Sequence, residues 1–323
     1  MDTFARNLST GATWLEPFDG AFGPNNFLAG TPEFHFDRYK TWIGERHPPR
    51  YFQMLLEKMD LPTQFALGAF IQAMGQNPGL EQELDSLGTA ARVYIGTGLG
   101  NIDTIHQASL TLREAQLTWD RFWTDPARNS ALAASGERVP EDPAAAEAWR
   151  RLWMERSPEL GRYLQELAAI EDLPVVNDSG AENIDAVKIA AMRDKEKRRM
   201  RQQDKWGAPD PPWKVSANVI FNLHNTPAAQ VAILGGIHGL AFAPVAACAT
   251  FGVALKLALD AIQSGEAKLV VVGATDPPPH PLVVGAFYSG RVLSAGNHVS
   301  LPLTRLQGHT GGRRSRAVDR GRP

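Results

Sequence analysis

The stretch Val245-Ala246-Ala247-Cys248-Ala249-Thr250 carries the only cysteine of the chain. The apolar residues 245–247 predict a short strand, and the residues after the cysteine predict a helix. At such a strand-to-helix turn, a thiol lies at the helix N-terminus, where N–H groups and the helix dipole favour a thiolate and can bind an oxyanion. A free cysteine elsewhere is commonly a small buried hydrophobe. The position of Cys248 therefore makes it a candidate nucleophile.

The residues that follow the cysteine predict an α/β fold. From 249 to 263 the polar residues form only a narrow stripe at helical spacing, which predicts a mostly buried helix, and Ser264-Gly265 ends it. Residues 268–273, Lys-Leu-Val-Val-Val-Gly, predict a strand buried on both faces. Strand, helix and strand within about thirty residues make a parallel βαβ unit.

Several motifs carry a resemblance to a known family. They are Gly236-Ile237-His238-Gly239, Ala247-Cys248-Ala249-Thr250, residues 260–267, residues 271–276, residues 287–294, the helix and loop at 4–19, and the strand with a glycine turn at 92–100. With these motifs the chain resembles the N-terminal half of a β-ketoacyl-acyl-carrier-protein synthase, a member of the thiolase-like superfamily. The resemblance implies half of a thiolase-like layered α-β-α fold, formed by residues 1–100 and 213–300. Residues 101–212 would be a helical insertion, and residues 301–323 an atypical basic tail.

The resemblance also implies an activity. In this family the cysteine accepts an acyl group from acyl carrier protein as a thioester, and a carbanion formed by decarboxylation of malonyl-carrier then attacks it. On that basis Cys248 is the catalytic residue and its amide one oxyanion donor, while Leu99 and Phe221 line the acyl pocket. The family works as a homodimer in fatty-acid or polyketide biosynthesis, and no cofactor is implied.

The chain departs from the family at its ends. The family's two downstream histidines are missing, and Gly308-His309-Thr310-Gly311-Gly312 imitates one of them too early in the sequence. The arginine-rich residues after 307 suggest a shifted reading frame or a natural disordered tail. A half-fold without its mate should expose a large apolar face and aggregate. Two other functions therefore stay open: a catalytically incomplete fragment that acts as an interaction partner, and a thiol acyltransferase that does not condense.

Composition excludes several classes of protein. The net charge of −2 gives no global field for nucleic acid, and a single cysteine excludes an internal disulfide and suits a reducing cytoplasm. No eighteen-residue apolar span or basic-then-apolar leader is present, so we expect a cytoplasmic protein without a membrane span. The histidines lack the spacing of metal ligands. Glycines 96, 98 and 100 lack the spacing of a dinucleotide motif.

The segment 101–212 is polar and helical. Helical periodicity covers residues 111–122, 143–154, 158–170 and 181–203. Four of its tryptophans are expected to be packing anchors rather than ligands of a cofactor: Trp119, Trp123, Trp149 and Trp153. Residues 188–205 contain eight lysines and arginines against three acids. That segment has three interpretations: a solvated helix face, a docking site for the acidic carrier protein, or a nucleic-acid-binding helix. The lack of interleaved aromatic residues argues against nucleic acid.

Overall fold

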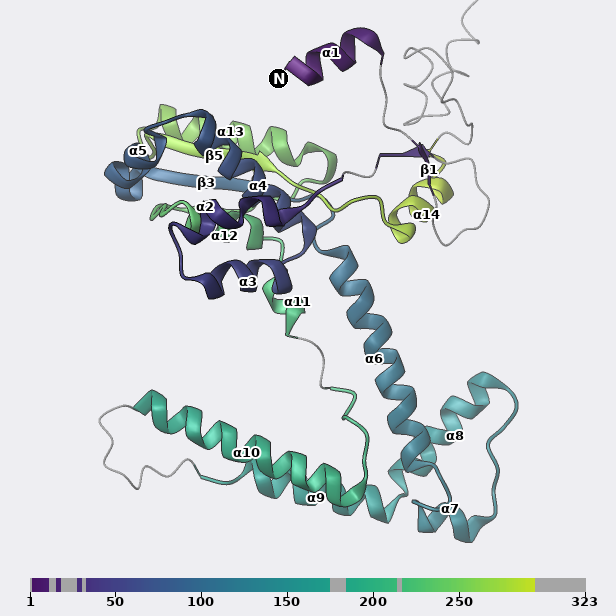
Figure 1. Ribbon diagram of the computed structural model, residues 1–323. Helices are drawn as coiled ribbons and strands as arrows, with labels where there is room; N and C mark the ends of the chain where they lie inside the picture. The colour runs from purple at the N-terminus through teal and green to yellow at the C-terminus, as the bar shows by residue number, and fades with distance from the viewer. Residues whose placement is uncertain are drawn as a thin grey trace, which may run out of the picture. The chain divides into compact units, whose positions relative to one another are not determined.

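The computed structural model describes residues 2–11, 16–18, 28–30, 33–174, 184–213 and 217–293. These residues form two compact units (Figure 1). The first unit contains the chain up to Ile105 and from Ala217 onward, and the second contains His106–Ser216. Our expectations for residues 294–323, which include the imitated histidine motif and the basic tail, lie outside the described residues.

The first unit is built on a three-stranded parallel sheet. Strand β3 (Ala91–Gly96) lies between β4 (Ala241–Phe242) and β5 (Leu269–Ala274). Because side chains alternate across a strand, β3 serves two cores. Ala91, Val93 and Ile95 join the core that contains α4 (Leu61–Gln76) and α12 (Thr226–Leu234), whereas Tyr94 joins α13 (Thr250–Gln263) on the opposite face (Figure 1). This helix-rich unit with a small parallel sheet fits the α/β class.

The remaining elements of the first unit are mostly helical. They are α1 (Asp2–Thr10), β1 (Glu16–Pro17), β2 (Leu28–Ala29), η1 (Phe36–Tyr39), α2 (Lys40–Gly44), α3 (Pro49–Lys58), α5 (Leu80–Leu87), η2 (Gly88–Ala90), α11 (Asn218–Phe221), η3 (Ala247–Ala249) and α14 (Pro281–Ser289). Helix α6 (Ile102–Trp123) begins in this unit and continues into the second. The strands β1 and β2 pair with each other in an antiparallel hairpin.

The expected order of strand, helix and strand around the cysteine is present, but the first strand was placed wrongly. We expected it at 245–247, whereas β4 covers Ala241–Phe242 and residues 247–249 form the 3-10 turn η3. Pro244 lies between them and has no N–H to donate to a strand ladder, so pairing with β3 stops before it. The strand expected at 268–273 is confirmed as β5.

The expected burial of the helix and the last strand is wrong in part. Helix α13 turns an alanine face to the sheet, with Ala254, Ala258 and Ala261 buried. Its large apolar side chains lie on the other faces and are exposed: Phe251 (52%), Leu255 (43%), Leu257 (36%), Leu259 (48%) and Ile262 (47%). Strand β5 contacts both cores but is only half-buried, because among the described strands it lies at the sheet edge.

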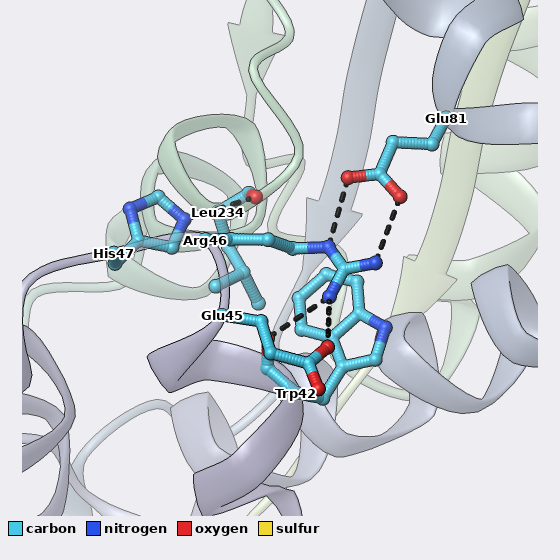
Figure 2. A network of polar contacts seen from close by, with 6 residues as sticks. All are labelled: Trp42, Glu45, Arg46, His47, Glu81 and Leu234. Carbon is cyan, nitrogen blue, oxygen red and sulfur yellow. Dashed lines mark hydrogen bonds and ion pairs between the residues drawn. The ribbon is translucent and has the colours of Figure 1, made fainter.

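A charged network fastens three helices of the first unit (Figure 2). Arg46, just after α2, donates from Nε and Nη2 to the two carboxylate oxygens of Glu81 in α5, at 2.8 and 3.0 Å. Its guanidinium also lies 3.9 Å from the ring centroid of Trp42. The neighbouring His47 ring approaches the Leu234 carbonyl of α12 at 3.4 Å. The hydrogen bond from Arg46 lowers the pKa of the Glu81 carboxyl.

The second unit confirms the expected helices and the packing role of the tryptophans. Besides the end of α6 it contains α7 (Ser130–Ser135), α8 (Pro143–Glu155), α9 (Pro158–Glu171) and α10 (Ile184–Trp206). Trp119, Trp123 and Trp153 are buried, and the first two pack edge-on against each other. Asn129 is fully buried and donates to the carbonyls of Trp123 and Trp153, at 3.0 and 2.8 Å.

Candidate functional site

Cys248 lies in a tight turn between β4 and α13. It is the middle residue of η3, directly before the first residue of α13, and its side chain is exposed. None of the hydrogen bonds of the described residues uses the backbone N–H of Cys248. The first N–H groups of a helix likewise have no partner within the helix. The thiol is therefore accessible, and it lies beside backbone N–H groups that can donate hydrogen bonds to an anionic oxygen.

Two local features hold this turn. Ala247 has a φ of 47°, a left-handed conformation that costs a non-glycine residue roughly 1–2 kcal/mol. The Thr250 hydroxyl accepts from the Ala246 N–H at 3.0 Å and donates to the Ala247 carbonyl at 2.8 Å. Thr250 is only 3% exposed, so these bonds are shielded from water. The turn is therefore strained at Ala247 and held in place by the side chain of Thr250, the first residue of α13.

Glycines at the end of β3 let the strand approach this turn. A Cβ at Gly96 would lie 2.0 Å from the Pro244 carbonyl oxygen and 2.5 Å from Cγ2 of Thr250. A Cβ at Gly98 would lie 3.1 Å from the Ala247 carbonyl oxygen. The absence of a side chain at these two glycines therefore lets the end of β3 pack closely against the backbone of the Cys248 turn.

The end of β5 completes the site. Asp276 follows β5, and its Oδ1 accepts hydrogen bonds from the N–H groups of Gly98 and Leu99, both at 2.8 Å. In parallel strands the carboxyl ends meet at one edge of the sheet, where ligands of α/β proteins commonly bind. Here the edge gathers the Cys248 turn after β4, the glycine turn after β3 and the carboxylate after β5.

The sequence-predicted residues differ in their placement. Leu99 belongs to the glycine turn that contacts the Cys248 turn, and it is 39% exposed. Phe221 ends α11 and is 42% exposed, and in the part of the chain that the structure describes no hydrogen bond or ring contact joins it to Cys248. The sequence analysis included Asp276 and Thr250 only as members of motifs and gave neither a role at the site. An acidic residue two positions after an apolar strand was the available signal for Asp276.

No hydrogen bond of the described residues joins a histidine to Cys248, although the His224 ring lies against Gly100 in the glycine turn. His238 lies in the turn after α12, and His280 precedes α14 as its N-cap. Within the described ranges, His, Cys, Asp and Glu form no group of three or more that could hold a metal. A search of the same residues finds no helix long and apolar enough to cross a membrane.

The basic segment of the second unit is helix α10, and part of its charge is paired. Arg199 binds Glu171 of α9, and Lys205 binds Glu166 of the same helix at 2.9 Å. Arg193, Lys197 and Arg201 are exposed, four residues apart, and form no ion pair among the described residues. Side chains at that spacing lie on one helix face.

Comparison with known proteins supplies the family. Residues 168–302 match the family model described as Beta-ketoacyl synthase, N-terminal domain. The match contains the Cys248 turn, α13, β5 and Asp276, and it begins in α9. No curated protein matches the chain. The matched segment carries a domain of acyl-transferring condensing enzymes, which confirms the resemblance found in the sequence. Over this segment, which is less than half of the chain, the sequence is similar to the β-ketoacyl synthase family.

Proposed function

We propose that Cys248 is the acyl-accepting nucleophile of a β-ketoacyl-acyl-carrier-protein synthase type of condensing enzyme. The main support is an exposed thiol on a fixed strand-to-helix turn, inside the segment that matches the family. The layered thiolase-like arrangement is part of the proposal, with residues 1–100 and 213–300 as its N-terminal half. Residues 101–212 would be the helical insertion.

The chemistry takes two transfers. The Cys248 thiolate attacks the thioester carbonyl of an acyl-carrier, a new C–S bond forms, and the carrier thiol leaves and takes up a proton. Malonyl-carrier then loses carbon dioxide, and the resulting carbanion attacks the acyl-cysteine carbonyl and releases the Cys248 thiolate. Both steps pass through a tetrahedral oxyanion, to which the Cys248 N–H would donate.

Leu99 and Phe221 are proposed to line the acyl chain. The position of Leu99 next to the Cys248 turn supports its assignment more directly than the position of Phe221 does. Replacing Leu99 with alanine should favour longer acyl chains. The measurement is the rate of Cys248 acylation over a series of chain lengths, with Phe221→Ala tested in parallel. An unchanged chain-length profile in both variants would remove them from the pocket.

The acidic carrier is proposed to approach the unpaired cations of α10. Clustered cations steer an anionic partner and make association salt-dependent. Charge reversal at Arg193 and Lys197 should weaken carrier binding more at low salt than at high salt. The matched control is Arg198→Glu, because Arg198 is already paired with Asp194. Equal loss in both variants would contradict a docking role for this face.

Intact mass spectrometry tests the nucleophile. Acyl-carrier or an acyl thioester should add one acyl mass to the chain, and Cys248→Ala should abolish that addition. A ketoacyl product formed with a malonyl donor would identify a synthase, whereas acylation without condensation would identify a thiol acyltransferase. A folded chain that does neither would leave the role of an interaction partner and refute the enzyme proposal.

A further inference from the structure

A groove lies between helices α9 and α10 of the second unit. Its volume is about 310 Å³. Its apolar lining comes from Leu167 of α9, from Met200 of α10, and from Pro211 and Trp213 in the segment that follows α10. All the residues that line it belong to the second unit, so the groove is separate from the Cys248 turn.

Trp213 is held in place and is nevertheless exposed. Its ring packs edge-on against the buried ring of Trp119, with 5.5 Å between the centroids. The side-chain amide of Gln203 in α10 donates to Oδ1 of Asp210 at 3.0 Å, which ties the segment that carries Trp213 to the helix. Even so, 56% of Trp213 is exposed. An exposed indole on a fixed support is typical of the residues that contribute most to a protein interface.

Exposed apolar side chains extend the groove along both helices. On α10 they are Ile189, Met192 and Met200, which stand at positions i, i+3 and i+11 and so share one helix face. On α9 the exposed Leu164 precedes Leu167 by three residues and lies beside it. The flexible side chains of methionine adapt to the shape of a partner. We call the groove and these side chains the α9–α10 face.

The charged groups inside the groove bind one another. Arg199 donates from Nε and Nη2 to the two carboxylate oxygens of Glu171, at 2.5 and 2.8 Å, and from Nη1 to Glu196 at 2.8 Å. Two carboxylates and one guanidinium leave a formal charge of −1 among the lining residues. Because both carboxylates are already bound, the charge that a partner meets is set mainly by the flank of the groove.

The flank of α10 beside the groove is cationic. Its exposed cations form no ion pair among the described residues: Arg193, Lys197 and Arg201. Lys197 stands three residues before Met200, so the two side chains are neighbours on the helix surface. Gln202, which donates to the Tyr163 carbonyl of α9, marks the opposite side of the helix. The exposed Asp204 shares the cationic flank, and three cations with one carboxylate leave it a formal charge of +2.

We propose that the α9–α10 face binds a helix of a partner protein that is apolar on one side and acidic on the adjoining side. An apolar side chain of that helix would enter the groove against Trp213 and Met200, and its carboxylates would lie over Arg193 and Lys197. A concave groove between two helices suits a helix, whereas a lipid surface needs a flat apolar face. This surface depends neither on acyl transfer by Cys248 nor on the partner being acyl carrier protein.

Three synthetic peptides of about eighteen residues, long enough to form a helix, test the proposal. The first carries leucine and tryptophan on one helix face and glutamate on the other. The second has lysine in place of every glutamate, and the third has the composition of the first in an order without helical periodicity. Methionine methyl signals of the ¹³C-labelled chain report the contact. The acidic peptide should move the signals of Met192 and Met200 and leave that of Met74, buried in the first unit, unchanged.

The acidic peptide should bind about tenfold or more tightly than the lysine peptide or the reordered one, because only it matches both the apolar groove and the cationic flank. Cys248→Ala should bind it like the unmodified chain. A failure of the proposed nucleophile would therefore leave this result unchanged.

Substitutions at exposed positions separate the groove from the flank. Met200→Glu should weaken binding of the acidic peptide about tenfold or more, because it places a carboxylate in the groove. Leu152→Glu is the matched control, since Leu152 is an exposed apolar residue of α8 outside the face, and it should leave binding unchanged. Arg193→Glu with Lys197→Glu should weaken the acidic peptide and strengthen the lysine peptide, a reversal that misfolding cannot produce.

The proposal is overturned if the Met192 and Met200 signals of the unmodified chain stay fixed in the presence of the acidic peptide. Equal binding of the lysine peptide or the reordered peptide would overturn it as well, as would an equal loss in Leu152→Glu and Met200→Glu. If vesicles of phosphatidylglycerol compete with the acidic peptide for these signals, the face is a lipid-binding surface and the proposal is wrong.

Discussion

Replacing Gly96 with alanine should displace the turn that carries Cys248. The added Cβ would lie 2.0 Å from the Pro244 carbonyl oxygen, a separation that must open by at least about 1 Å because real Cβ contacts below 3.0 Å essentially do not occur. The atom it meets is backbone, so no side chain can turn aside. Overpacking of this kind costs typically 1–3 kcal/mol and more where backbone must move, so we expect about 3 kcal/mol or more.

The chain supplies a site-specific assay, since Cys248 is its only thiol. The rate of alkylation by iodoacetamide reports on the turn, and thermal melting followed by circular dichroism reports on stability. Of the described tryptophans only Trp42 lies in the first unit, so tryptophan fluorescence reports mainly on the second unit and should stay unchanged.

Gly75→Ala is the matched control for this variant. Gly75 lies in α4 with no atom within 4 Å of an added Cβ, so alanine there should stabilise the helix by about 0.5–1 kcal/mol and leave alkylation unchanged. If Gly96→Ala melts and alkylates like the unmodified chain, the close approach of β3 to the Cys248 turn is refuted.

Three further changes test the rest of the structure. Glu81→Gln should lower the free energy of unfolding by at most about 1 kcal/mol at neutral pH, since the pair with Arg46 is largely exposed. Because the pKa of Glu81 is lowered in the fold, the stability that the pair contributes is present above the ordinary pKa of 4.5 and is lost as the pH falls through the folded pKa. The unfolding free energy of the variant, measured by urea melts, should therefore fall less steeply at acid pH. Asn129→Ala should destabilise the second unit by about 3 kcal/mol by leaving two buried carbonyls and the Leu132 N–H unpaired, seen as an earlier transition in tryptophan fluorescence. Leu255→Lys with Leu259→Glu should reduce aggregation measured by light scattering without lowering the melting temperature, and an unchanged tendency to aggregate would show that the exposed face of α13 does not cause it.

The sequence predicted the elements with strong periodicity and missed what depends on tertiary contact. The helix after Cys248 and the strand at 269–274 follow from local apolar patterns, and their positions are confirmed within a residue or two. The strand before the cysteine was misplaced because Val245-Ala246-Ala247 has an extended, apolar composition, whereas pairing with β3 decides where a ladder forms. The burial of α13 was overestimated because periodicity shows which residues are apolar and not which of them meet a partner.

The sequence singled out Cys248 as the candidate nucleophile, which stays a prediction, and it did not identify the residues that hold the Cys248 turn. Residue type and motif single out Cys248. The hydrogen bonds that the glycine turn donates to Asp276, however, join residues more than 170 positions apart in the chain. No local pattern encodes such a pairing.

The geometry around Cys248 depends on close backbone packing and on side chains that bind backbone groups, those of Thr250 and Asp276. Gly96 and Gly98 act through the absence of a Cβ, Ala247 through its backbone conformation, and Asp276 by binding two N–H groups. A site of this kind places an exposed thiol rigidly while leaving the space above it open for a substrate, which an acyl-transfer nucleophile requires. The side chains that select the substrate can then change without disturbing the turn. We therefore expect substitutions at Leu99 to alter acyl preference with little loss of stability, and substitutions at Gly96 to have the opposite effect.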